Sequence, residues 1–262
     1  MESRNPVFNN NQGFSRGGYA TFRTPSSDEL QGMYEAPSAT ALQTGRMTLD
    51  DVVIRTAALF TVLVAAAATM YYVVKPGPAI VFGSAIAALV LGLVVSFSKT
   101  VRPALILGYG LLEGVFVGGI SYWYAQRFGN QIVPQAVIGT LVAFGTMLAL
   151  YKAGVVRNSP RFTKILIIAG VSYLVCGLVQ LVVVLAGGPS VYSMGGLGIL
   201  VSGLGVVLAS LYLVLDFDFV EQGVRNGIPQ QYAWTAAFGL VVTLVWLYLE
   251  ILRLLAILQN NR

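Results

Sequence analysis

The sequence is poor in the residues that most often carry enzyme chemistry. It contains no histidine, a single cysteine (Cys176) and only 10% charged residues. One cysteine supports neither an intrachain disulfide nor a thiolate metal site. Acid–base chemistry and ion coordination must therefore fall to carboxylates, hydroxyls and backbone carbonyls. The charged fraction is well below the roughly 25% of a soluble domain, which argues against a water-soluble globular protein.

The sequence contains long runs of apolar residues and few charged ones. A helix rises about 1.5 Å per residue, so about 20 apolar residues cross the ~30 Å hydrocarbon core of a bilayer. Seven windows of this length follow one another along the chain: 56–74, 79–98, 103–125, 132–151, 165–186, 195–217 and 232–252. We predict an all-α polytopic membrane protein with a seven-helix transmembrane domain over residues 49–258.

The first 48 residues have a different composition. They are polar, rich in Gly, Ser, Asn and Pro, and show no apolar periodicity. This composition predicts a disordered N-terminal tail. No apolar stretch follows a basic start at residue 1, so the pattern is not that of a secretory signal peptide.

The positive charge predicts membrane orientation and not nucleic-acid binding. The formal net charge is +5, and seven spans divide the basic residues unequally between the two sides. One side holds Arg46, Arg55, Lys99, Arg102, Lys152, Arg157, Arg161, Lys164 and Arg225. The other holds Lys75, Arg127, Arg253 and Arg262. Because excess Lys and Arg mark the cytoplasmic side, we expect a cytoplasmic N-terminus and a C-terminus outside.

Three acids lie at the C-terminal end of the sixth apolar window or just after it. Ionisable groups at membrane depth cost ~2.5–3.5 kcal/mol on insertion scales and are functional candidates. Asp216 shares a helical face with Ser202, Gly205, Ala209 and Tyr212. Small residues let helices approach closely, so we expect Asp216 to face the bundle. Asp218 and Glu221 lie on the other side of the helix, where they are either solvated headgroup-level acids or a cation entrance.

Two further acids lie within spans. Glu113 borders the small-residue pattern Gly110, Gly114 and Gly118, which predicts close packing of this helix on a neighbour. It is either a structural buried carboxyl or an ion ligand. Glu250 has Arg253 three residues later, so a helix-end ion pair competes with a pore role.

Intramembrane proteolysis finds little support in the sequence. An aspartyl protease of this kind needs a second acid in a Gly-x-Gly-Asp context, and a serine hydrolase needs Gly-x-Ser-x-Gly. The first motif does not occur, and the second occurs only at residues 13–17, in the polar N-terminal tail and not at a strand-to-helix turn. We therefore expect no enzymatic activity and no resident cofactor.

Several segments resemble a known family. "YLVLDFDFVEQGV", "FGLVVTLVWLYLEILRLLAIL", "GYGLLEGVFVGGIS", "MTLDDVVIRTA" and "NPVF" are similar to segments of the Bax inhibitor-1 family, in its bacterial YccA-like branch. The resemblance covers residues 47–258. It implies a bundle with the last helix at its centre, in the plasma membrane of a bacterium.

The same resemblance implies a pH-sensitive calcium leak gated by two hydrogen-bonded aspartates. The first corresponds to Asp216. The position of the second falls on Thr243, and the nearest acid, Glu250, is two turns later on the same face. A basic residue near the third span helps to close the pore in these relatives, and Lys99 or Arg102 can serve here.

Two functions from different classes follow. The first is a cation leak for calcium or protons through the lipid bilayer, with transient calcium contacts at Asp216. Glu113 and Thr243 would supply further oxygens, because hard divalent cations prefer several. The second is a binding modulator of a membrane-bound AAA protease, engaged through the N-terminal tail and without transport activity.

Overall fold

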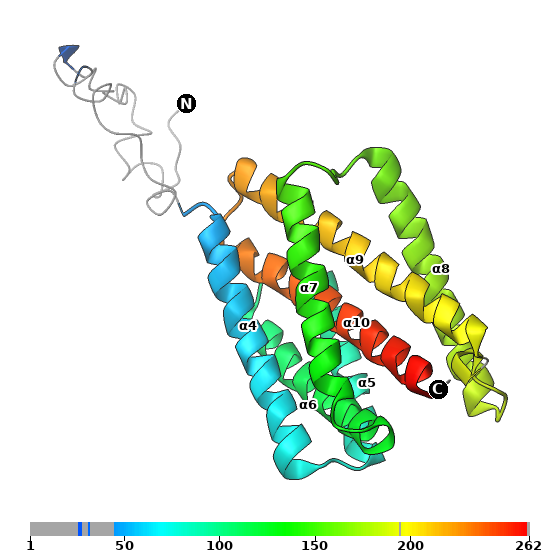
Figure 1. The fold of residues 1–262 in the computed structure, drawn as a ribbon. Coiled ribbons are helices and arrows are strands. Elements are labelled where there is room, and N and C mark those ends of the chain that lie inside the picture. Colours follow the sequence, from blue (N-terminus) through cyan, green and yellow to red (C-terminus); the bar gives the residue numbers. More distant parts are fainter. Residues whose placement is uncertain (1–25, 28–30, 32–44, 194, 261–262) are drawn as a thin grey trace, which may run out of the picture. The chain divides into compact units, whose positions relative to one another are not determined.

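The computed structural model describes residues 26–27, 31, 45–193 and 195–260. The chain divides into two units, residues 1–40 and 41–262. The predicted N-terminal tail lies almost wholly outside the described residues. The second unit is a bundle of helices, shown in Figure 1.

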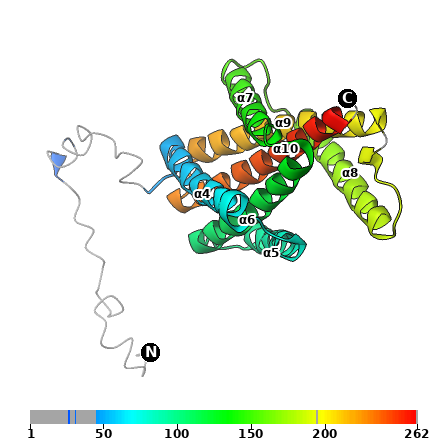
Figure 2. The ribbon, with the colours of Figure 1, turned by 60° about the horizontal axis from the view of Figure 1, so that its bottom comes forward.

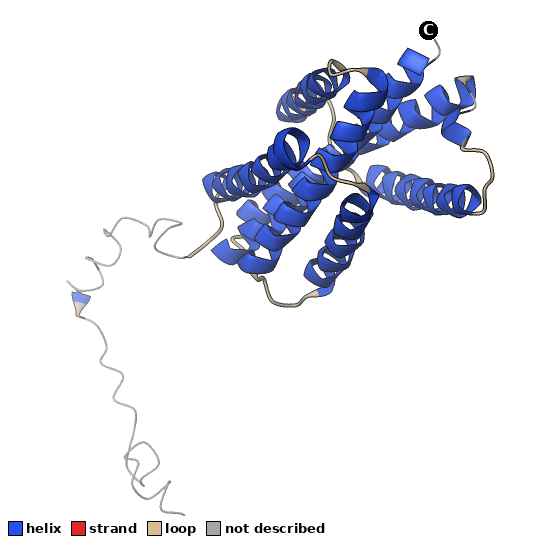
Figure 3. Ribbon diagram, turned by 90° about the horizontal axis from the view of Figure 1, so that it is seen from below, coloured by secondary structure: helices blue, strands red, loops and turns tan. Residues whose placement is uncertain are grey.

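Seven helices are long and apolar enough to cross a membrane in the described part of the chain, as the sequence predicts. They are α4 (Leu49–Thr69), α5 (Pro78–Phe97), α6 (Pro103–Phe128), α7 (Ile132–Lys152), α8 (Pro160–Leu185), α9 (Gly196–Arg225) and α10 (Ala233–Asn260). The π-helical turn η2 (Met70–Val74) extends α4, and the 3-10 turn η4 (Gln230–Tyr232) precedes α10. Figure 3 shows helices and loops only among the described residues. Apart from those of the terminal turns, the backbone polar groups of a helix are satisfied within the helix, which is what hydrocarbon requires.

Helix starts follow local sequence signals. Proline occupies the first turn of α5, α6 and α8, where its missing N–H costs nothing. Thr48 caps α4 in a capping box with Asp51. The helix therefore begins at Leu49, seven residues before the apolar window that predicts it, because capping bonds and not hydropathy define its first turn.

The last helix, α10, lies at the centre of the bundle (Figure 1). It packs mainly against α4, α6, α7 and α9, whereas α5 packs on α6 and α8 on α9. Two apolar clusters meet on it: Phe238, Val241 and Tyr248 belong to one, and Leu240 and Leu247 to the other. Over half of its most apolar window is buried, against none of that of α8.

The predicted small-residue face of α6 packs against α4. A Cβ atom on Gly114 would overlap the Leu63 carbonyl oxygen, and one on Gly118 would overlap the Ala67 carbonyl oxygen. Only glycine allows the two backbones to come this close. This contact fixes α4 and α6 as one pair beside α10.

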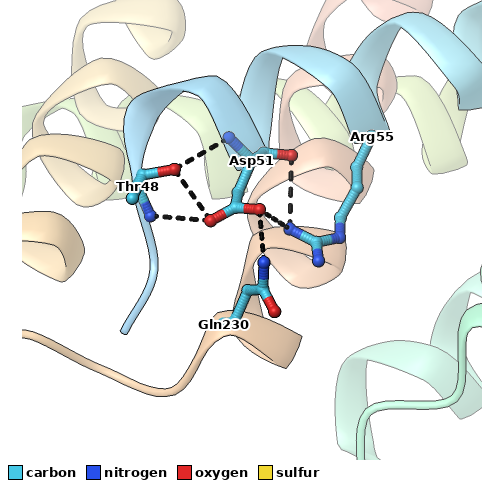
Figure 4. A network of polar contacts seen from close by, with 4 residues as sticks. All are labelled: Thr48, Asp51, Arg55 and Gln230. Carbon is cyan, nitrogen blue, oxygen red and sulfur yellow. Dashed lines mark hydrogen bonds and ion pairs between the residues drawn. The ribbon is translucent and has the colours of Figure 1, made fainter. Parts of the chain in front are cut away.

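A polar clasp joins the start of α4 to the connection between α9 and α10 (Figure 4). Asp51 accepts bonds from the Thr48 N–H at 3.1 Å and from Gln230 Nε2 at 2.6 Å, and it pairs with Arg55 at 3.1 Å. The chain before Thr48 runs beside the same connection, because Met47 N–H donates to the Ile228 carbonyl at 2.8 Å. The clasp therefore ties the segment that enters the bundle to α9 and α10.

Candidate functional site

Asp216 lies at the interface between α9 and α10. Its face of α9 is buried as the spacing predicts: Ser202, Gly205 and Ala209 are all covered. The Asp216 carboxyl faces the Thr243 hydroxyl of α10. Its Oδ2 atom is buried and has no hydrogen-bond partner among the described residues. A buried polar atom without a partner is costly, so it marks a position that packing alone does not explain.

A cavity of about 350 Å³ opens beside this carboxyl. The end of α5, the α5–α6 connection, α6, α9, η4 and α10 line it. Its polar side chains are Ser96, Ser98, Lys99, Thr100, Arg102, Asp216, Tyr232 and Thr235. The structure thus brings Asp216 together with both basic residues that the resemblance suggests for pore closure.

The cavity holds one acid and two bases. Lys99 and Arg102 are exposed at its rim. Within residues 45–193 and 195–260, no ion pair joins either of them to Asp216. The basic side chains are therefore near the carboxyl without being locked to it, and both are long enough to change position at little cost.

The donor set of this cavity does not suit a resident calcium ion. Calcium takes six to eight oxygen ligands, several of them carboxylates. The described residues contain no group of three His, Cys, Asp or Glu side chains that could hold a metal ion. Asp216 and neighbouring hydroxyls fit a brief contact with a passing cation.

Glu113 lies away from this cavity, on α6. It hydrogen-bonds to Tyr109 one turn earlier on the same helix. Tyr109 in turn packs edge-on against Phe238 of α10, with ring centroids 4.9 Å apart. Glu113 is thus held by a local hydroxyl and does not line the Asp216 cavity.

Glu250 is buried near the other end of α10 and is fully partnered. Arg253 Nη1 donates to both of its carboxyl oxygens at 3.0 Å, and Trp246 Nε1 donates to Oε1 at 3.3 Å. The helix-end ion pair expected from the i, i+3 spacing is present. Glu250 lines a second cavity and not the one at Asp216.

Asp218 and Glu221 tie α9 to the α7–α8 region. Asp218 accepts a bond from Asn158 Nδ2 at 2.6 Å. Glu221 accepts one from the Tyr151 hydroxyl and pairs with Arg225 at 3.1 Å. Both acids lie off the Asp216 cavity, as their opposite position on the helix predicts. They hold neighbouring segments in place, whatever else they do.

Sequence reasoning did not single out Asp51, although a signal was present. Thr48 and Asp51 have the spacing of a capping box just before an apolar run. The bond from Gln230 has no comparable signal, because its donor comes from a position 179 residues away.

A family model described as Bax inhibitor 1 like matches residues 5–260 of the chain. No curated protein matches it.

Proposed function

We propose a function for this chain, which belongs to the Bax inhibitor 1-like family. It is a non-enzymatic, pH-sensitive cation leak of the membrane. The inner mouth of the leak is the Asp216 cavity, and calcium and protons are its candidate ions. The observation that carries the proposal is the buried Oδ2 atom of Asp216, which has no hydrogen-bond partner among the described residues and lies beside a cavity with several polar side chains.

The chemistry of this carboxyl supports gating. When it is protonated, the neutral group packs between α9 and α10 beside Thr243 and keeps the helices together. When it ionises, a charge that is poorly solvated at this depth favours entry of water and cations into the cavity. Lys99 and Arg102 at the rim repel cations in either protonation state of Asp216 and so oppose the leak.

The test is calcium flux into liposomes containing the purified full chain, measured across pH. Wild-type flux should rise as pH rises, because ionised Asp216 favours the hydrated cavity. Asp216→Asn should flatten this dependence. Asp218→Asn, a matched change outside the cavity, should retain it. If the two variants behave alike, or if wild-type protein passes no calcium at any pH, the leak proposal is wrong.

Neutralising the rim tests the closing role separately. Lys99→Gln with Arg102→Gln should raise flux at the pH where wild-type protein is least active, because the opposing charge is gone. Lys152→Gln at the end of α7 with Arg157→Gln on the α7–α8 connection, both outside the cavity, is the matched control and should leave flux unchanged. Equal flux in the rim variant and the wild type would remove Lys99 and Arg102 from the mechanism.

A second function is supported by the clasp. In this alternative the protein binds and modulates a membrane-bound AAA protease through its N-terminal segment. Residues 45–48 are hydrogen-bonded to the connection between α9 and α10. A partner that displaces this segment would therefore also displace the adjoining ends of both helices. Co-purification of the protease with the full chain, and its loss when residues 1–44 are removed, would favour this function, provided that liposome flux is absent.

We also propose a bacterial plasma membrane of the YccA-like type as the setting, with the Asp216 end of the bundle facing the cytoplasm. The excess of Lys and Arg at that end supports this orientation. In a Cys176→Ser background, a cysteine at Ser159 should react with impermeant reagent from the cytoplasmic side and one at Ser190 from outside. The reverse labelling would invert the orientation.

A further inference from the structure

Helix α8 stands apart from the rest of the bundle. Only Leu166 is buried along its length, and α9 is its main contact among the described elements (Figure 2). A second cavity, of about 680 Å³, lies between α8, the α8–α9 connection, α9 and α10. The Asp216 cavity shares no residue with it.

The two walls of this cleft differ in chemistry. The α8 wall is mostly apolar, with Val171, Leu174, Leu181 and Val184 all exposed to the surroundings of the bundle, and Tyr173 and Gln180 are its polar side chains. The facing wall is aromatic and charged, and its side chains are Tyr192, Tyr212, Trp246, Glu250 and Arg253. A cleft with one apolar wall and one wall of aromatic and charged side chains fits an amphiphilic ligand.

One end of the cleft is closed by a tyrosine. The Tyr212 hydroxyl donates to the Leu166 carbonyl of α8 at 3.0 Å, and the ring packs on Gly170. Toward the other end, Arg253 lies over the ring of Tyr192, with 4.4 Å between its guanidinium carbon and the ring centroid. A ligand must therefore place its polar group near Arg253 and its apolar part along α8.

Arg253 keeps donors for such a ligand. Both of its hydrogen bonds to Glu250 use Nη1. Nε and Nη2 donate to no acceptor among the described residues. The Tyr173 hydroxyl lines the same cleft and lies beside the Glu250 carboxyl. A guanidinium with unused donors recognises phosphate well.

We propose that this cleft binds one membrane phospholipid, with its phosphate against Arg253 and an acyl chain along α8. Arg253 is about 20 residues from the start of α10, or ~30 Å at 1.5 Å per residue, which is one hydrocarbon thickness. The headgroup would thus lie at the interface opposite the Asp216 end. This site does not depend on the leak proposal.

Native mass spectrometry of the purified full chain tests the site with three probes. Phosphatidylglycerol carries both phosphate and chains, diacylglycerol of the same chains lacks the phosphate, and glycerol phosphate lacks the chains. Phosphatidylglycerol should bind at one site, and each of the other two should bind at least about tenfold more weakly, since each lacks one half of the contacts. Equal binding of diacylglycerol would remove Arg253 as headgroup ligand, and equal binding of glycerol phosphate would leave an anion site without a lipid.

A variant that fills the cleft tests its location. A Cβ atom on Gly177 meets no atom within 4 Å, so Gly177→Leu projects into the cleft without disturbing the packing of the bundle. It should weaken phosphatidylglycerol binding about tenfold or more. Gly145→Leu on α7 also meets open space, lies outside the cleft and is the matched control.

Paired removal of the charges tests the headgroup contact without leaving a lone buried charge. Glu250→Gln with Arg253→Gln should lose preference for phosphatidylglycerol over diacylglycerol while retaining the thermal midpoint of a folded protein. Unchanged phosphatidylglycerol binding in Gly177→Leu, or unchanged preference in the paired variant, overturns the proposal.

Discussion

Asp216, which is partly buried, and Glu250, which is buried, lie toward opposite ends of the α9–α10 pair, and their carboxyls are held in opposite ways. Glu250 has a guanidinium at 3.0 Å and an indole N–H within hydrogen-bond distance. Asp216 faces one hydroxyl and leaves Oδ2 without a partner among the described residues. A partnered charge stabilises a fixed structure, whereas an unpartnered acid retains the freedom to change its protonation state. Glu250 therefore holds a fixed contact, and Asp216 is where the proposed leak places its proton-linked change.

The largest expected contrast is in stability. Glu250→Ala leaves Arg253 without its partner, and removing one member of a buried ion pair costs about 3–5 kcal/mol. Asp216→Ala removes a group whose partners are incomplete, so its cost should be below about 1 kcal/mol. Thermal unfolding in one detergent measures both. Comparable losses in the two variants would contradict the contrast.

A methyl group added beside each carboxyl sharpens the comparison. A Cβ atom on Gly205 would lie 2.7 Å from Glu250 Cδ and would overlap the Tyr173 hydroxyl, whereas one on Gly239 would lie 3.8 Å from Asp216 Oδ1. Gly205→Ala should therefore cost about 2 kcal/mol through overpacking. Gly239→Ala should cost less than about 1 kcal/mol, because its contact is ordinary and alanine favours helix. A larger loss of the unfolding midpoint in Gly239→Ala than in Gly205→Ala would show that the side chains around Glu250 adjust to the added methyl group more easily than those around Asp216.

The smallest effect concerns the clasp near the Asp216 end. Thr48→Ala removes a helix cap and should cost about 1 kcal/mol. Its local signature is faster amide hydrogen exchange at the start of α10, around residues 234–239, with exchange around residues 250–257 unchanged. Ser159→Ala removes the cap of α8 and is the matched control, which should spare both regions of α10. Uniform acceleration along α10 in Thr48→Ala would mean that the clasp holds the whole bundle.

Short-range features were predictable from the sequence. The seven helices, the close glycine face of α6 and the Glu250–Arg253 pair all depend on spacing within one segment. The Asp216 face also followed from spacing, because residues three and four apart share a side of a helix. The meeting of Asp216 with Lys99 and Arg102 was expected only from the family resemblance, and no spacing within α9 predicts it.

Long-range contacts needed the folded chain. Gln230 donates a hydrogen bond to Asp51, which lies 179 positions earlier in the chain. The α8 cleft depends on the angle between α8 and the helices beside it. Neither apolar periodicity nor composition reports how a helix is rotated about its axis or where it crosses another. Those quantities depend on side-chain packing across many residues.

The sequence by itself determined that the chain forms membrane-spanning helices, because hydrocarbon satisfies no backbone hydrogen bonds and long apolar runs must satisfy their own. It also determined the partner of Glu250, since Arg253 is one turn away on the same helix. Only the tertiary structure decided that Asp216 has an oxygen beside a cavity with no partner in the part of the chain that the structure describes. The groups around that carboxyl come from different helices and connections, and their approach depends on how α10 packs at the centre of the bundle.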